Sequence, residues 1–585
     1  MTRAPLPGIS DYDWHDSSAG IVYLAPVPQT GNWHVHVTWL ADGQTRDLTP
    51  IDGVHARLLA RSAAHPGNLY VALSDDEVVT GDVYRVDPET GARLLVREED
   101  SEGSYLAGTD LTPLVVQRFV AGGFSWAVLD ADASWRDIGH VGPEDALGTV
   151  LDGFSADGAY AFLRDSRGGE TIGLVRLSLA DAGSEVLARD PDADIARIIY
   201  DPRSGVPIAY AVEDSRRRWT ALTADAALAL ERLALLAPGD LDILDQSSDG
   251  RYWLIAFDSS DAPPAYFLYD RNSRAASPIG LTRPVWTDLP TVAQRPVTIL
   301  NRDGTKLVGY LSLPPERKID DTGKPDKLSP LVLVVHGGPW DRDRFGFAPV
   351  HQWLASRGYA VLSVNYRGSI GFGKSFVAAA DGAWGTAVVD DLIDAARWAV
   401  KQKIAKEDRL ALLGGAFGGY GALMAMARAA DSFACAVSLA PPVDLIDFVK
   451  RIPASTPPLY HLFRARVGDP ATARGRTMLS AQSPRAQVAA IGGAVLLAGG
   501  GRDPLVPLAS LTAFADRLAA RQVDIAEIHF PDEGHGLARN ANTRAFFAAA
   551  EVFLGRCLDG RVEPVTADDI AGTSLAVKRG GVLMP

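Results

Sequence analysis

Short apolar runs recur at a regular interval through the first half of the chain. Each run has three to five residues and follows a glycine or a proline, as at Gly20, Gly67 and Pro113. The six runs occupy residues 21–24, 69–73, 114–116, 160–163, 207–210 and 252–255. The residues that precede them, which also include Gly158, Gly205 and Gly250, are separated by 47, 46, 45, 47 and 45 positions.

Within one repeat, further strands are joined by turn-forming residues. Residues 82–86 and 92–96 are rich in β-formers, and the sequence Asp-Pro-Glu-Thr-Gly between them predicts a hairpin. A period near 46 residues, with about four short strands in each unit, is typical of a β-propeller. Six repeats are visible. An unrelated series of β-hairpins is the alternative interpretation.

The pattern changes after residue 283, where Pro284, Pro290 and Pro296 interrupt any regular element. Residues 297–300 and 306–311 then predict an antiparallel hairpin. Apolar runs at 331–335, 410–413, 494–498 and 525–530 follow, with the amphipathic stretch 390–400 among them. Buried strands combined with helical stretches indicate an α/β fold with a largely parallel sheet.

One tight turn in this second half carries a chemical signature. Residues 414–418 read Gly-Gly-Ala-Phe-Gly, directly after the strand 410–413 and before the helical stretch 422–427. Strand, glycine turn and helix form the turn that presents a serine nucleophile in α/β-hydrolases, because glycines permit the strained backbone and the close helix packing. Ala416 occupies the position where that serine belongs.

The other parts of such a site follow in the expected order of nucleophile, acid and histidine. Asp503 lies 87 residues after Ala416, just past the strand 494–498, and His535 lies 32 residues later, past the strand 525–530. The glycine loop after the strand 331–335 can supply the backbone N–H of Gly338 to an oxyanion hole, together with the N–H of Phe417. Each residue alone would be an ordinary loop residue, but their order and placement together predict a hydrolase site.

These observations predict two domains and a tail. We expect a β-propeller over residues 8–283, an α/β-hydrolase catalytic domain over 284–560 and a C-terminal tail over 561–585. Nothing in the sequence indicates a cofactor or a metal site. The tail ends in an apolar stretch at 581–584 that could dock on a domain or on a second subunit, so a homo-oligomer is left open.

The segment from about residue 290 to 558 resembles the catalytic domain of the prolyl oligopeptidase family of serine peptidases, particularly its acylaminoacyl-peptidase branch. The matching motifs lie at residues 336–339 (His-Gly-Gly-Pro), 365–373, 414–420, 483–484, 503–507 and 533–536. The resemblance implies short peptides or acylated peptides as substrates, with the propeller covering the site. Propellers of this family commonly have seven blades, so a seventh blade hidden from the repeat pattern is also open.

Ala416 departs from the family pattern, and three interpretations compete. A serine-to-alanine change introduced to trap substrate or prevent self-digestion would leave the other parts intact, as they are here. A natural pseudoenzyme could bind peptides or a partner without turnover. A different chemistry could use the same cleft, for example water activated by His535. Hydrolysis of small esters or amides also stays open, since the triad fixes acyl chemistry but leaves the acyl group undefined.

Composition narrows the partners and the compartment. The chain has 585 residues and a formal charge of −15, which disfavours a nucleic-acid partner. It has only two cysteines, Cys435 and Cys557, so we expect no disulfide framework and allow a reducing compartment. The first 16 residues lack the apolar core of a secretory signal, and no stretch of 18 apolar residues suggests a membrane span. The prediction is a cytoplasmic protein without membrane contact.

Overall fold

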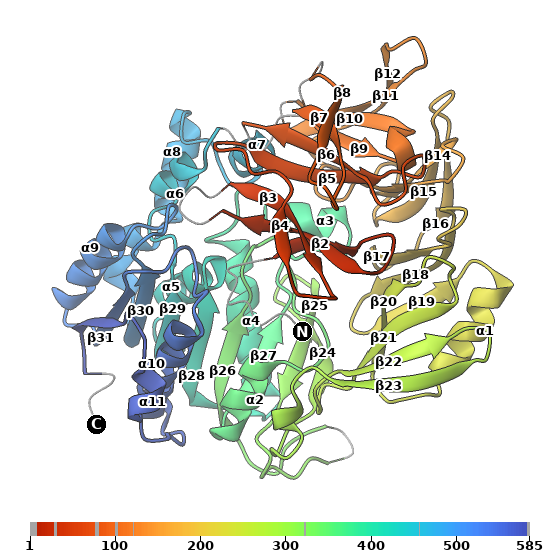
Figure 1. Ribbon diagram of the computed structural model, residues 1–585. Helices are drawn as coiled ribbons and strands as arrows, with labels where there is room; N and C mark the ends of the chain where they lie inside the picture. Colours follow the sequence, from red (N-terminus) through yellow and green to blue (C-terminus); the bar gives the residue numbers. More distant parts are fainter. Residues whose placement is uncertain are drawn as a thin grey trace.

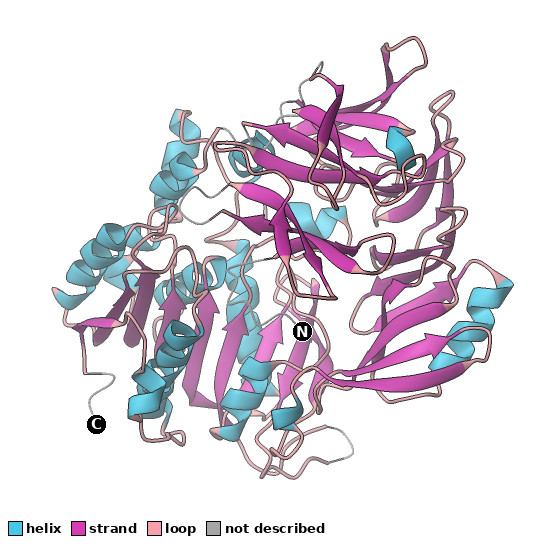
Figure 2. Cartoon of the chain, viewed as in Figure 1, coloured by secondary structure: helices cyan, strands magenta, loops and turns pink. Residues whose placement is uncertain are grey.

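The computed structural model describes residues 9–581, apart from 28–31, 76–80, 100–102, 121, 321–322 and 455–456. Figure 1 shows a ring of small sheets built from the first half of the chain, lying against a larger α/β unit built from the second half. Strands dominate the ring, whereas helices cover both faces of the sheet in the α/β unit (Figure 2).

Six sheets form the ring, which confirms a β-propeller with six blades. The six apolar runs of the sequence repeat form the second strands of the blades, β2, β6, β10, β14, β18 and β21. The blade strands are β1 (Ser10–Trp14), β2 (Gly20–Pro26), β3 (Trp33–Trp39), β4 (Thr45–Asp47), β5 (His55–Arg61), β6 (Leu69–Ser74), β7 (Asp82–Val86), β8 (Arg93–Arg97), β9 (Ser104–Ala107), β10 (Leu114–Val120), β11 (Gly123–Leu129), β12 (Trp135–Val141), β13 (Val150–Phe154), β14 (Tyr160–Asp165), β15 (Gly173–Ser178), β16 (Ser184–Ala188), β17 (Ile195–Tyr200), β18 (Pro207–Glu213), β19 (Arg217–Ala221), β20 (Asp240–Gln246), β21 (Tyr252–Asp258), β22 (Ala265–Asp270) and β23 (Ala275–Leu281).

The fifth blade differs from the others. Its sheet has three strands, β17, β18 and β19, where the other five blades have four. Helix α1 (Ala224–Leu233) follows β19, and its buried face, including Ala226 and Leu233, packs with Ile208 and Trp219 of this blade. A helix therefore stands where the fourth strand would be. The described residues contain no seventh blade.

The α/β unit is built on one sheet of nine strands in the order β24-β25-β27-β26-β28-β29-β30-β31-β32. Neighbours from β27 to β31 pair in parallel, while β24, β25 and β32 pair antiparallel with their neighbours. The strands are β24 (Gln294–Leu300), β25 (Lys306–Ser312), β26 (Ser329–Val335), β27 (Ala360–Val364), β28 (Ala405–Gly415), β29 (Cys435–Leu439), β30 (Ala494–Gly500), β31 (Ile525–Phe530) and β32 (Ala576–Arg579). This arrangement confirms the α/β-hydrolase fold.

Helices bury both faces of this sheet. One apolar core packs α4, α5 and α9 on one face, and a second packs α2 and α10 on the other. The helices are α2 (Pro349–Ser356), α3 (Lys374–Ala378), α4 (Ala387–Lys401), α5 (Phe417–Arg428), α6 (Leu445–Arg451), α7 (Pro457–Arg466), α8 (Ala473–Ala481), α9 (Leu508–Ala519), α10 (Asn540–Leu558) and α11 (Ala567–Ile570). Four short 3₁₀ turns complete the described elements: η1 (Thr109–Leu111) in the propeller, and η2 (Pro284–Trp286), η3 (Pro484–Ala486) and η4 (Val488–Ala490) in the second half of the chain.

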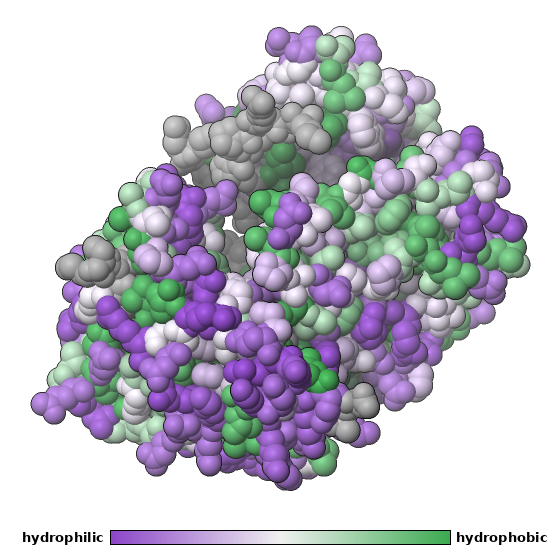
Figure 3. Space-filling model, turned by 90° about the horizontal axis from the view of Figure 1, so that it is seen from below, coloured by the Kyte–Doolittle hydropathy of each residue, from purple (hydrophilic) through white to green (hydrophobic). Residues whose placement is uncertain are grey.

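The C-terminal tail docks on its own domain. Strand β32 extends the sheet by pairing antiparallel with β31, where His529 faces Ala576. Of the apolar end at 581–584, residues 582–584 lie outside the described residues. Among the described residues, no helix is both long and apolar enough to cross a bilayer. The face seen in Figure 3 mixes hydrophilic residues with scattered hydrophobic groups.

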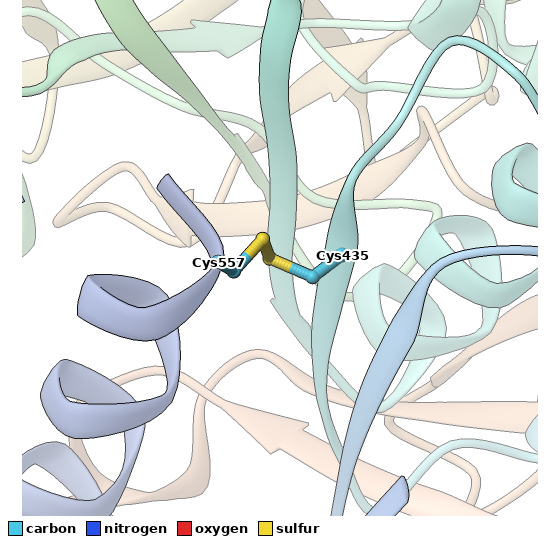
Figure 4. Close-up of a disulfide and its surroundings, with 2 residues drawn as sticks. All are labelled: Cys435 and Cys557. Carbon is cyan, nitrogen blue, oxygen red and sulfur yellow. A yellow bond between two sulfur atoms is a disulfide. The ribbon is translucent and has the colours of Figure 1, made fainter. Parts of the chain in front are cut away.

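The cysteine count led us to expect no disulfide framework and did not predict the one disulfide that the structure contains. Cys435 at the start of β29 and Cys557 near the end of α10 form a disulfide across 122 positions of sequence (Figure 4). A count of two cysteines says nothing about their distance, which depends on α10 packing over the sheet beside β29. Disulfides persist mainly in oxidising environments, so the cysteine content no longer supports a cytoplasmic location, which stays a prediction.

Candidate active site

The position expected to carry a nucleophile lies at a strained turn between β28 and α5. Ala416 has φ 49° and ψ −116°, a backbone conformation that residues with a side chain rarely adopt. Holding it costs on the order of 1–3 kcal/mol. Two hydrogen bonds fix the turn: the N–H of Ala416 donates to the carbonyl of Leu439 (2.8 Å), and its own carbonyl accepts from the N–H of Tyr420 (3.0 Å).

The glycines around this turn are required by close backbone contacts. A Cβ atom on Gly418 would lie 2.1 Å from the carbonyl oxygen of Val335, at the end of β26. A Cβ atom on Gly414 would lie 2.4 Å from the carbonyl carbon of Gly418. The turn therefore packs directly against the end of β26, and glycine at position 418 permits this close approach.

Asp503 and His535 come together at the same edge of the sheet. They follow β30 and β31, which run parallel to β28, so all three expected triad positions lie past the carboxyl ends of parallel strands. Nδ1 of His535 lies 2.7 Å from Oδ2 of Asp503. The other oxygen of Asp503 accepts the N–H groups of Leu505 (2.8 Å) and Val506 (2.9 Å). Both oxygens of the buried carboxylate therefore have hydrogen-bond partners, and these bonds fix the orientation of the His535 imidazole.

The loop that carries His535 is held by a residue whose role the sequence did not reveal. The buried carboxylate of Glu533 accepts the N–H groups of Ala538 and Arg539, each at 3.0 Å, and a hydrogen bond from Asn542 at 2.7 Å. These bonds tie the histidine loop to the start of α10. Glu533 belongs to the family-like motif at 533–536, but no local pattern could indicate which N–H groups it would bind.

The two expected oxyanion donors lie on facing segments. Gly338 follows β26, has φ +115° and is exposed, whereas Phe417 opens the 12-residue helix α5. Within the described part of the chain, neither of their N–H groups donates a hydrogen bond to the protein. The start of a helix favours negative charge because its first N–H groups point outward.

Buried side chains support the loop of Gly338 from the side. Nε2 of His336 lies 2.9 Å from Oγ of Ser369, and the hydroxyl of Tyr366 donates to the carbonyl of His336 (2.9 Å). Burial lowers the pKa of His336 to about 4, so its ring is neutral at physiological pH. Sequence reasoning noted these segments only as family-like motifs and did not predict that they touch.

Three cavities have walls from both the propeller and the α/β unit; one of about 500 Å³ lies between Phe119 and Leu459, and the other two lie near Arg342. These two measure about 230 and 180 Å³ and share Glu213, Arg342 and Arg344 in their walls. Ala416, Asp503 and His535 line none of the three. Among the described residues, no group of three or more His, Cys, Asp or Glu side chains is arranged to hold a metal ion.

Comparison with known proteins identifies the family of this chain. Residues 345–561 match the model of the prolyl oligopeptidase family. The chain is 35% identical to dipeptidyl aminopeptidase BIII of Pseudoxanthomonas mexicana, in an alignment that covers 100% of this chain and 85% of the relative. The chain therefore belongs to the prolyl oligopeptidase family of serine peptidases.

Solved structures share the two-part fold. A puromycin-hydrolyzing peptidase of Mycobacterium tuberculosis superposes with a TM-score of 0.74 at 19% identity, covering 95% of this chain and 88% of that one. The acylaminoacyl peptidase of Pyrococcus horikoshii gives a TM-score of 0.69 at 15% identity, covering 96% and 90%. At these identities the similarity shows the fold alone.

Proposed function

We propose that this site is built to hydrolyse peptides through an acyl-enzyme, with a serine at position 416 as the nucleophile. The observation that carries the proposal is the hydrogen bond between His535 and a fully satisfied Asp503, at the same sheet edge as the strained turn. The serine would attack the scissile carbonyl while neutral His535 takes its proton and later gives it to the leaving amine. Asp503 would hold the tautomer and stabilise the imidazolium.

The negative charge that develops on the carbonyl oxygen would be bound by the N–H groups of Phe417 and Gly338. Loss of one such donor typically costs about 10²–10³ in turnover. The location of Phe417 at the start of α5 supports this role, because the helix dipole favours an anion there.

We further propose that the chain with Ala416 is an inactive form of this peptidase. A methyl group cannot form the acyl-enzyme, so turnover should fall on the order of 10⁶-fold. The strained backbone at Ala416 supports this interpretation, since an alanine gains nothing from a conformation that serves to present a nucleophile.

The substrates that we propose are short peptides. The Pseudoxanthomonas relative is named a dipeptidyl aminopeptidase, which supports the release of dipeptides. Membership of the prolyl oligopeptidase family supports peptides as the general class of substrate. We also propose that the propeller covers the site, so that it admits short chains and excludes folded proteins.

The decisive experiment is to restore the nucleophile with Ala416→Ser. The variant should be labelled at residue 416 by an organophosphonate and should hydrolyse short peptides, whereas the unchanged chain should do neither. The double variant Ala416→Ser/His535→Ala is the matched control and should lose both properties. Substrates should include dipeptide and acyl-amino-acid anilides, simple esters and a length series that ends in a folded protein.

The outcomes separate the alternatives. Turnover of esters without peptides would favour a small-molecule esterase. A folded serine variant that is neither labelled nor active would refute the proposal. Cleavage of a folded protein at the rate of a short peptide would refute the size filter.

A second candidate function is peptide binding without turnover, which Ala416 itself favours. Calorimetric titration of the unchanged chain with short peptides tests it directly. Tight binding combined with an inactive Ala416→Ser variant would establish this function in place of the peptidase.

A further inference from the structure

The loop of Gly338 is fastened to the propeller by a buried arginine. Arg342 is 6% exposed, and its guanidinium donates to the carbonyl oxygens of Glu213 (2.5 Å) and Asp214 (2.6 Å), which lie at the end of β18. A third bond from its Nε reaches the carbonyl of Asp343 (3.3 Å). The planar guanidinium thus holds the propeller backbone and the loop in one fixed geometry.

The segment beside this loop has its own propeller anchor. The N–H of Ile370 donates to the carbonyl of Asp341 (3.1 Å), which joins the segment to the loop. One oxygen of Asp194, in the propeller, accepts the N–H groups of Gly371 (3.0 Å) and Gly373 (3.4 Å). Its other oxygen accepts an N–H from its own domain, that of Ile172 at 2.8 Å. The propeller therefore holds the Gly338 loop through Arg342 and the neighbouring segment 370–373 through Asp194.

We propose that Arg342 is a positioning residue for the oxyanion hole, through which the propeller sets the orientation of the Gly338 N–H. Gly338 lies only four residues before Arg342. The start of the loop lies against the turn at Gly418, because a Cβ atom on Gly418 would lie 3.0 Å from the carbonyl oxygen of His336. An oxyanion donor acts only within a narrow range of distance, so a small loop displacement costs rate. The inference rests on the proposed function.

Arg466 supplies a matched control. It is also 6% exposed and also donates to two consecutive propeller carbonyls, those of Pro143 (3.1 Å) and Glu144 (3.2 Å). It lies at the end of α7, far in sequence from Gly338. Helix α7 touches the oxyanion loop where Phe463 packs edge-on against Trp340 (ring centroids 5.0 Å). Replacing Arg466 keeps this contact while it removes an interdomain contact of the same kind as that of Arg342.

The first test needs no activity. Amide hydrogen exchange is measured over residues 336–345 in the unchanged chain and in its Arg342→Ala and Arg466→Ala variants. Arg342→Ala should speed exchange of this segment about 10-fold or more, while α5 stays protected as the measure of intact folding. Arg466→Ala should leave the segment unchanged. Equal exchange in all three proteins, or equal acceleration by both variants, would overturn the proposal.

The second test uses Ala416→Ser as the parent enzyme, with active sites counted by organophosphonate labelling. Adding Arg342→Ala should lower kcat per active site by about 10- to 100-fold, less than complete loss of a donor, and should change KM little. Arg342→Lys should be intermediate, because an ammonium cannot reproduce the bidentate contact. Adding Arg466→Ala should leave kcat within about 3-fold of the parent value, because this substitution does not displace an oxyanion donor.

The two tests distinguish failure of the role proposed for Arg342 from failure of the proposed function. An active parent whose kcat is unchanged by Arg342→Ala would refute the role of Arg342 in catalysis. A parent without peptide turnover would refute the proposed function, and the exchange result would still decide whether Arg342 orders the loop.

Discussion

Reduction of the Cys435–Cys557 disulfide should destabilise the α/β unit strongly. The bond closes a loop of 122 positions, which contains β30, α9, β31 and most of α10. For a loop of this length, the chain-entropy relation gives about 16 cal/mol/K, or about 5 kcal/mol at 25 °C. Because one kcal/mol shifts the Tm of a domain of this size by roughly 2–4 °C, the α/β unit should melt about 10–20 °C lower after reduction.

The assay is thermal unfolding with and without a reductant, in which hydrogen exchange in α10 identifies the α/β unit. The double variant Cys435→Ala/Cys557→Ala is the control, and its Tm should not respond to the reductant. Thiol titration of the denatured, unreduced chain should find no free thiol. Two free thiols per chain, or equal Tm values before and after reduction, would refute the reasoning.

Three further predictions concern single positions. Ala416→Gly should raise the free energy of unfolding by about 1 kcal/mol, because the relief of backbone strain exceeds the entropy cost of glycine. Urea titration measures this change, and a lower free energy of unfolding for the variant would mean that the turn is unstrained. Gly418→Ala should cost about 3 kcal/mol or more in the same assay, because its Cβ would meet the carbonyl of Val335, whereas Gly534→Ala has open space and should cost far less. Burial raises the pKa of Asp343 to about 7, so the native state keeps a proton that the unfolded state releases near pH 4. The contribution of Asp343 to stability should therefore fall between about pH 4 and pH 7. The unchanged chain should lose stability relative to its Asp343→Asn variant over this range, and a constant difference between the two would contradict the assignment.

Much of the fold could be predicted from the sequence because it depends on local signals. The period near 46 residues and its turn residues indicated the blades, and the six predicted runs became six second strands. Glycine spacing around Ala416 indicated the strained turn once it was combined with the flanking strand and helix and with the later Asp503 and His535, because this geometry needs small residues on both sides. The order of Ala416, Asp503 and His535 along the chain also predicted that they follow parallel strands.

The tertiary structure decided what depends on contacts between distant segments. The pairing of Cys435 with Cys557 follows from α10 packing over β29, which no cysteine count can reveal. The helix in the fifth blade likewise depends on packing against its neighbours. Arg342 looks like any loop arginine in the sequence, and its role depends on two propeller carbonyls more than 120 residues earlier in the chain. Local patterns specify elements, whereas the docking of the two domains determines which side chains meet.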